Sequence, residues 1–115
     1  DEMNLLMKEF GDNPFIGYWH DFGHIQRKHN LLILNHEQFL RRMSSHLIGG
    51  HVNDVKWPAR DHQVPLLGGV VPFERLLPFF PHGVPLVWEL SGRVSSEDIR
   101  AARKLWMEKF PQTLA

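Results

Sequence analysis

The chain has 115 residues, enough for one hydrophobic core, and we expect residues 1–115 to form a single domain. Thirteen basic residues balance thirteen acidic ones, so composition predicts no attraction for nucleic acid or an anionic membrane. The absence of cysteine excludes disulfides, thiolate metal sites and thiol nucleophiles. Without a membrane-spanning apolar run or a signal-peptide pattern, the sequence predicts a cytoplasmic protein.

The first half of the sequence predicts a helix, a strand and a second helix. Residues 1–11, DEMNLLMKEFG, space their apolar side chains as a helix does, and they indicate a chain entered within a longer fold. A turn at DNP then leads to a predicted strand over residues 15–19, FIGYW. Asn35 and Gln38 have the spacing of a capping box and predict a helix over residues 34–43, LNHEQFLRRM.

The middle of the sequence predicts a second strand and a third helix. The strand is expected within residues 46–52, HLIGGHV, although its two glycines weaken the pattern. A long loop over residues 56–69 separates it from a helix over residues 72–80, PFERLLPFF. Pro78 should end or kink that helix early, because proline cannot donate the backbone hydrogen bond.

The last part of the sequence completes an alternating order of elements. Residues 84–90, VPLVWEL, are the clearest predicted strand, and Ser95 with Asp98 caps a helix that reaches Phe110. The order α-β-α-β-α-β-α implies crossover connections, and therefore an α/β fold with about three parallel strands and four helices. We find no internal repeat and no linker that divides the chain.

Each predicted strand leads into a side chain that can bind a metal. The first leads to Asp21, which His20 and His24 flank, the second ends at His51, and the third ends at Glu89. The carboxyl ends of parallel strands share one edge, where such folds bind ligands. This oxygen and nitrogen set suits Mn²⁺, Mg²⁺, Co²⁺, Fe²⁺ or Zn²⁺. The sequence therefore predicts a divalent-metal site.

Each of these residues also has a purely structural interpretation. Asp21 can bond its own backbone in an Asx turn, and a single histidine such as His51 is usually a packed, hydrogen-bonded group. Glu89 lies in an apolar strand and needs a partner, which either a metal or an arginine such as Arg93 supplies. The coincidence at three strand ends is what favours the metal site.

Four segments carry a resemblance to a known family. In order they are GYWHDFGH, LIGGHVNDV, DHQVPLLGGVVPF and PLVWELSGRVSSEDI. They resemble the last third of the xylose-isomerase-like TIM barrels, a superfamily of sugar isomerases, sugar epimerases and apurinic-site endonucleases. The resemblance extends from about Asn13 to Phe110. It implies a partial (β/α) TIM barrel whose strands are equivalent to the sixth, seventh and eighth.

The resemblance also implies roles for particular residues. Asp21, His51 and Glu89 match metal ligands of the family, and Glu89 matches a ligand that also moves a proton beside the substrate carbonyl. His24, in a D-x-G-H pattern, matches a residue that contacts substrate or a further metal. The candidate substrate-binding residues are His24, Asp61, His62 and Arg93.

The implied function is that of the C-terminal part of a divalent-metal-dependent isomerase or epimerase of a sugar or sugar phosphate, incomplete on its own and active once the missing strands complete it. Such an enzyme removes a proton next to a metal-polarised carbonyl. The LLGG segment at residues 66–69 could offer backbone N–H groups to a hydroxyl or phosphate, although two glycines more often make a turn. Trp19, Trp57 and Trp88 could stack on a sugar, or they could belong to the core.

Two departures from the family limit this interpretation. Asp61 and His62 are adjacent, whereas the endonuclease branch has an Asp-x-His pair, and this difference with the neutral charge counts against DNA as a substrate. The family's glutamate ligand on the preceding strand is absent, because Glu2 and Glu9 belong to the opening helix.

A complete barrel has eight strands and typically about 250 residues. We therefore expect a homo-oligomer, or a partner that supplies the N-terminal part of the barrel. One alternative is a non-catalytic, self-associating part-barrel with a remnant metal site. A weaker alternative is a metal-dependent phosphodiester hydrolase of the apurinic-site endonuclease type.

Overall fold

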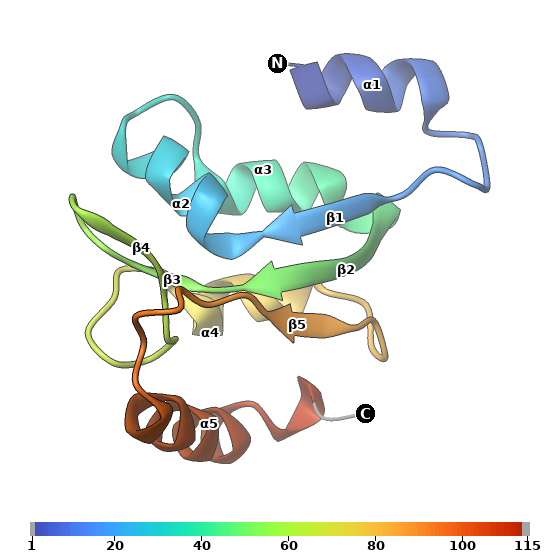
Figure 1. Cartoon of the computed structure of the whole chain (residues 1–115). Helices are drawn as coiled ribbons and strands as arrows, with labels where there is room; N and C mark the ends of the chain where they lie inside the picture. Colours follow the sequence, from blue (N-terminus) through green and yellow to red (C-terminus); the bar gives the residue numbers. More distant parts are fainter. Residues whose placement is uncertain (1, 114–115) are drawn as a thin grey trace.

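Three short parallel strands form the centre of the fold, in the order β1–β2–β5 (Figure 1). The structure is a computed structural model, and it describes residues 2–113. The strands lie side by side in their order along the chain, so a crossover connection joins each neighbouring pair. This arrangement confirms the predicted α/β class and the three parallel strands. The strands are β1 (Tyr18–Asp21), β2 (Leu47–Val52) and β5 (Leu86–Trp88).

Helices and one hairpin surround this sheet. The hairpin pairs β3 (Asp54–Lys56) with β4 (Arg60–Gln63) in the antiparallel sense, beyond the carboxyl end of β2. None of the described helices is long and apolar enough to cross a membrane. The helices are α1 (Glu2–Phe10), α2 (Phe22–Asn30), α3 (His36–Met43), α4 (Phe73–Leu76) and α5 (Ser96–Lys109), with 3₁₀ turns at Ser44–His46, Leu77–Phe79 and Pro111–Thr113.

The first strand begins later in the chain than the sequence predicts. The expected strand over residues 15–19 is wrong at its start, because β1 begins at Tyr18 and extends to Asp21. Asn13 keeps the preceding residues in a turn: its side-chain oxygen accepts from the Phe15 N–H, and its carbonyl accepts from the Ile16 N–H. Polar residues that we expected after the strand therefore lie within it.

Helix α2 is an element that the sequence analysis did not predict, so the expected total of four helices is wrong. It follows β1 without a loop, because the Asp21 side chain caps it by accepting from the His24 N–H at 2.8 Å. Its apolar face has little more than Phe22 and Ile25, and both are buried. Such a short apolar face gives a weak periodic signal.

The predicted loop over residues 56–69 is also corrected, because β4 lies within it and pairs with β3. By contrast, the predicted caps are confirmed: Asn35 accepts from the Gln38 N–H at 3.0 Å, and Ser95 accepts from the Asp98 N–H at 3.1 Å. The expected early end of the third helix is confirmed too, since α4 stops at Leu76 and a 3₁₀ turn carries Pro78. The third strand spans only Leu86–Trp88.

The two faces of the sheet have different surroundings. Side chains alternate along a strand, so Tyr18 and Trp88 point to the helices while Trp19 and Val87 point the other way. Phe39 of α3 packs edge-on against Tyr18 at 5.8 Å between ring centroids, and Trp106 of α5 packs against Trp88 at 5.7 Å. The opposite face, which we call the open face, leaves Trp19 37% and Val87 48% exposed.

Asp54 fixes the segment that follows the hairpin. This buried carboxylate accepts backbone N–H groups from Val55 at 2.8 Å, Val71 at 3.0 Å and Leu66 at 3.3 Å. A Cβ atom at Gly69 would overlap with the carboxylate, so the loop can close around it only with glycine there. The N–H of Leu66, at the start of the LLGG segment, and that of Val71, just beyond it, thus bind Asp54, in agreement with the interpretation of this segment as a turn.

A chain of buried side-chain hydrogen bonds crosses the core behind β1. Tyr18 Oη lies 2.9 Å from His20 Nδ1, His20 Nε2 lies 2.9 Å from His36 Nε2, and His36 Nδ1 lies 2.7 Å from Gln26 Oε1. Because the amide oxygen of Gln26 can only accept, His36 Nδ1 donates and its Nε2 accepts from His20. The Tyr18 hydroxyl then donates to His20, and both imidazoles are neutral.

This arrangement predicts that acid destabilises the fold. Burial lowers the pKa of His20 well below its usual range, and burial, with a smaller contribution from His29, lowers that of His36 from 6.5 to about 3. The unfolded chain takes up protons below pH 6.5 whereas these imidazoles do not. The free energy of unfolding should therefore fall as pH drops from 6.5 toward 3, by up to about 1.4 kcal/mol per pH unit for each histidine.

Urea denaturation between pH 7 and pH 5 measures this slope. His36→Gln removes one of the two groups and should give a shallower dependence, even where the variant is less stable at every pH. Equal slopes in the two proteins would contradict the assignment of His36 as a neutral buried histidine.

Candidate metal centre

The pairing of the strands brings Asp21, His51 and Glu89 to one place on the open face. Asp21 is the last residue of β1 and lies opposite His51 of β2. His51 in turn lies opposite Val87 of β5, and Glu89 follows two residues later on the same face. The Glu89 N–H donates to the Val52 carbonyl at 3.1 Å, which continues the strand pairing up to the site.

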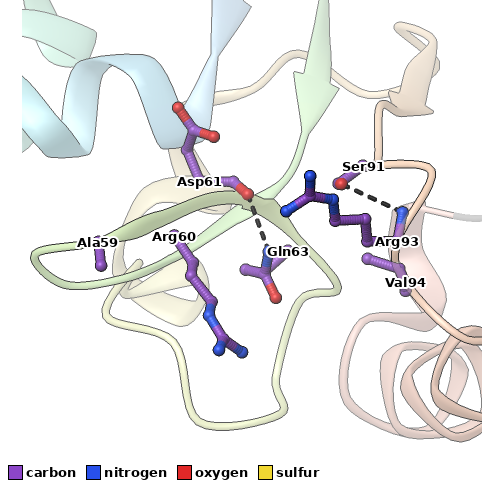
Figure 2. A pocket seen from close by; sticks show the side chains of 7 residues that line it. All are labelled: Ala59, Arg60, Asp61, Gln63, Ser91, Arg93 and Val94. Carbon is purple, nitrogen blue, oxygen red and sulfur yellow. Dashed lines mark hydrogen bonds between the residues drawn. The ribbon is translucent and has the colours of Figure 1, made fainter.

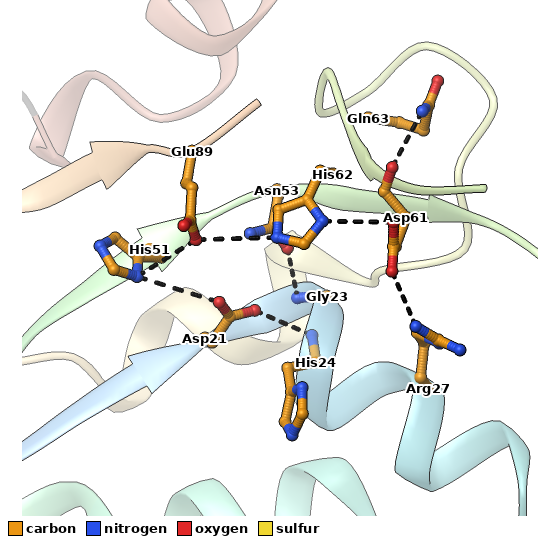
Figure 3. Close-up of polar contacts among 10 residues, drawn as sticks. All are labelled: Asp21, Gly23, His24, Arg27, His51, Asn53, Asp61, His62, Gln63 and Glu89. Atoms are coloured by element: carbon orange, nitrogen blue, oxygen red, sulfur yellow. Dashed lines mark hydrogen bonds and ion pairs between the residues drawn. The ribbon is translucent and has the colours of Figure 1, made fainter. Parts of the chain in front are cut away.

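The three side chains converge closely enough to share a cation (Figure 3). His51 Nδ1 lies 3.3 Å from Glu89 Oε2 and 3.9 Å from Asp21 Oδ2. One ligand atom from each residue lies within 4.8 Å of the other two. Ligands bound at about 2.0–2.2 Å lie at most about 4.4 Å apart, so small side-chain rotations suffice. Two carboxylates and one imidazole suit a divalent cation such as Mn²⁺, Co²⁺ or Zn²⁺.

Asp21 uses its two carboxylate oxygens for different purposes. Oδ1 accepts from the His24 N–H at 2.8 Å and caps α2. Oδ2 faces His51. The geometry is therefore compatible with both interpretations of Asp21: it bonds the backbone nearby, and it can also act as a metal ligand. The cap fixes the orientation of the carboxylate without occupying the oxygen that points to the site.

A second group of polar residues joins the site from the hairpin. His62 Nε2 lies 3.8 Å from Glu89 Oε2, and His62 Nδ1 lies 3.2 Å from Asp61 Oδ1. Asp61 Oδ2 accepts from Arg27 of α2 at 2.7 Å. The hydrogen bond with His62, and to a smaller extent the charge of Arg27, lowers the pKa of Asp61. This series of contacts runs without interruption from α2 to Glu89 (Figure 3).

The other predicted substrate-binding residues lie farther from the three ligands. Figure 3 shows the His24 imidazole directed away from them, and His24 lines a cavity of about 620 Å³ beside β1. Arg93 lies in the loop after β5 and lines a separate cavity with the hairpin (Figure 2). Among the described residues, the ion-pair partners of Glu89 are His51 and His62, so Arg93 does not neutralise it.

The three tryptophans separate into different environments. Trp88 belongs to the core, against Trp106. Trp57 lies in the turn of the hairpin, between β3 and β4. Trp19 lies on the open face, edge-on to His51 at 5.4 Å between ring centroids, and its ring lies so close to Gly49 that a Cβ atom there would overlap with it. Among the three tryptophans, Trp19 is thus the one placed to contact a small molecule bound at the site.

Sequence analysis did not identify Arg27 or Asn53 as part of this region. Arg27 pairs with a residue 34 positions away, and no local pattern reveals such a contact. Asn53 directly follows β2, and its Oδ1 accepts from the Gly23 N–H at 2.8 Å. Its buried Nδ2 has no hydrogen-bond partner among the described residues. Asn53 could have been identified from the sequence, because it is a polar residue directly after a strand, and the same pattern identified Glu89.

Comparisons of the chain with protein-family models, with curated proteins and with solved structures found no match. The fold and the site themselves define an α/β domain with a candidate metal centre at the carboxyl ends of three adjacent strands. The chemistry that the arrangement supports is cation binding by two carboxylates and an imidazole, with a second imidazole beside one of the carboxylates.

The shared site predicts that each ligand is needed for metal affinity. Asp21→Ala, His51→Ala and Glu89→Ala should each weaken Mn²⁺ or Zn²⁺ binding by more than roughly 100-fold, because changes outside the ligand set already cost 10- to 100-fold. Isothermal titration calorimetry measures the affinities. His82→Ala is the matched control, since His82 is an exposed histidine before β5, at the opposite end of the sheet. Unchanged affinity in the three ligand variants would contradict a shared site.

Proposed function

We propose that this chain is the C-terminal part of a divalent-metal-dependent isomerase or epimerase of sugars or sugar phosphates. The observation that carries the proposal is the placement of Asp21, His51 and Glu89 at the carboxyl ends of three adjacent parallel strands, on one face. In (β/α) barrels the active site occupies this end of the strands. The sequence resemblance to xylose-isomerase-like barrels supports the same assignment, with β1, β2 and β5 as the sixth to eighth strands.

The chemistry assigned to the site is proton transfer next to a carbonyl. Asp21, His51 and Glu89 would hold a divalent cation, which would polarise that carbonyl and stabilise the negative charge that develops on its oxygen. Both contacts of Glu89 with the histidines involve Oε2, and the side chain is 47% exposed. Oε1 can therefore accept a proton from the substrate carbon and return it, which makes Glu89 the catalytic base.

The neighbouring residues orient this base. Asp21 is fixed by its cap to α2, and His51 lies between the two carboxylates. His62 approaches Glu89 Oε2 from the hairpin and is itself held by Asp61. These contacts restrict the Glu89 carboxylate on one oxygen and leave the other toward the open face. Trp19, beside His51, offers an apolar surface for the carbon chain of a sugar.

A direct test is deuterium exchange at the carbon beside the carbonyl. The chain with Mn²⁺ in D₂O is incubated with a panel of ketoses and ketose phosphates, and NMR follows the incorporation of deuterium. Exchange should be lost in Glu89→Gln, which keeps an oxygen ligand but cannot accept the proton, and it should be kept in His82→Ala. A chain that binds metal but catalyses no exchange with any substrate would favour the non-catalytic part-barrel.

A second proposal concerns the partner that covers the open face. Trp19 and Val87 are exposed there, and β1 and β5 both leave one edge without a neighbouring strand among residues 2–113. Unpaired edges and an apolar face favour association. We infer that a second copy of the chain, or an N-terminal barrel part, covers this face.

Native mass spectrometry at micromolar concentration tests the association. The mass measured for the wild-type chain should be that of an oligomer. Val87→Lys should increase the fraction of monomer, because it places a charge on the open face. Met107→Lys is the matched control on α5, because Met107 is 44% exposed, close to the 48% of Val87. A wild-type chain that is entirely monomeric would contradict association between copies.

A further inference from the structure

A polar cavity lies between the hairpin and the loop that follows β5 (Figure 2). Its volume is about 420 Å³, within the range of small-molecule sites. Residues from both segments line it, so its two walls are far apart in the chain. The lining residues are Ala59, Arg60, Asp61, Gln63, Ser91, Arg93 and Val94.

The lining of the cavity has two arginines and one aspartate, and so carries a net positive charge. Across residues 2–113, neither the Arg60 nor the Arg93 guanidinium forms an ion pair, whereas Arg27 and Arg75 each pair with a carboxylate. The one acidic residue in the lining is Asp61, and its two oxygens already contact His62 and Arg27. Electrostatics in this cavity therefore favour an anion.

The walls of the cavity are held together by the backbone. The Ser91 N–H donates to the His62 carbonyl at 2.8 Å, which ties the loop after β5 to β4. The Ser91 hydroxyl oxygen accepts from the Arg93 N–H at 3.2 Å, so its own hydrogen can point into the cavity. Gln63 donates to the Asp61 carbonyl at 2.9 Å, which orients its amide (Figure 2). The cavity thus adds two neutral polar groups to its two guanidinium groups.

The cavity adjoins the candidate metal centre along both walls. His62, which approaches Glu89, lies between Asp61 and Gln63 in β4. On the other wall, Ser91 is two residues beyond Glu89, so their Cα atoms lie at most about 7 Å apart. That spacing suits a small molecule whose reacting carbonyl lies at the metal centre and whose anionic group lies in the cavity.

We propose that this cavity binds the phosphate group of the substrate, through Arg60 and Arg93, and so selects phosphorylated sugars. The substrate class rests on the proposed function, whereas the phosphate site itself rests on the cavity. A phosphate monoester offers three oxygens, which two guanidinium groups can share, whereas one guanidinium alone satisfies a carboxylate. Ser91 and Gln63 complete the set of donors.

The test is a ¹H–¹⁵N NMR titration of the chain with inorganic phosphate at constant ionic strength, with EDTA to remove metal ions. Saturable shifts are expected at the amides of Gln63, Ser91 and Arg93. The double variant Arg60→Gln with Arg93→Gln should raise the dissociation constant by roughly tenfold or more, because charge-assisted bonds are lost. The double variant Arg100→Gln with Arg103→Gln, on exposed positions of α5, is the charge-matched control and should leave binding unchanged.

Two further titrations separate this inference from the proposed function. Asp21→Asn, which keeps the cap of α2, should bind phosphate as the wild type does, and ribose 5-phosphate should shift the same amides while ribose should not. Absence of saturable phosphate shifts, or equal affinity in the double arginine variant, would overturn the phosphate site. A wild-type chain that binds phosphate but does not bind Mn²⁺ or Zn²⁺ would overturn the proposed function and leave the phosphate site unaffected.

Discussion

The register of the three parallel strands is the constraint on which the rest of the structure depends. It places Asp21 opposite His51, and it places Glu89 two residues beyond the partner of His51. A shift of one residue in either pairing would send a ligand into the core and a core residue to the open face. The buried chain from Tyr18 to Gln26 fixes which face of β1 points to the helices, because its first two members come from that face and its last two belong to α3 and α2.

Much of this arrangement can be predicted from the sequence because it depends on local features. A short apolar run followed by a polar side chain marks the carboxyl end of a strand, and three such ends identify Asp21, His51 and Glu89. Parallel pairing then follows from the alternation of helices and strands. The caps at Asn35 and Ser95 are equally local, since donor and acceptor lie three residues apart.

The remaining features depend on contacts between distant parts of the chain. Helix α2 has few apolar residues, and it is stabilised by Asp21 at its start and by the bond between Gln26 and His36 of α3. The strand Arg60–Gln63 is entirely polar, so no preference for strand structure reveals it. The cavity beside the candidate metal centre exists only where this strand meets the loop after β5, and a linear pattern cannot show that contact.

Asp21 both caps α2 and faces the candidate metal site, whereas His51 has only the second of these roles. The identity of the residue at each of the two positions is therefore explained by different requirements. Capping of α2 alone requires only a short polar side chain at position 21, and asparagine or serine would serve there as well as aspartate. His51, half exposed beside Trp19, would be under no comparable demand from folding. A requirement for a cation ligand would therefore be visible at His51, and at the second carboxylate oxygen of Asp21, more directly than in the presence of a capping residue at position 21.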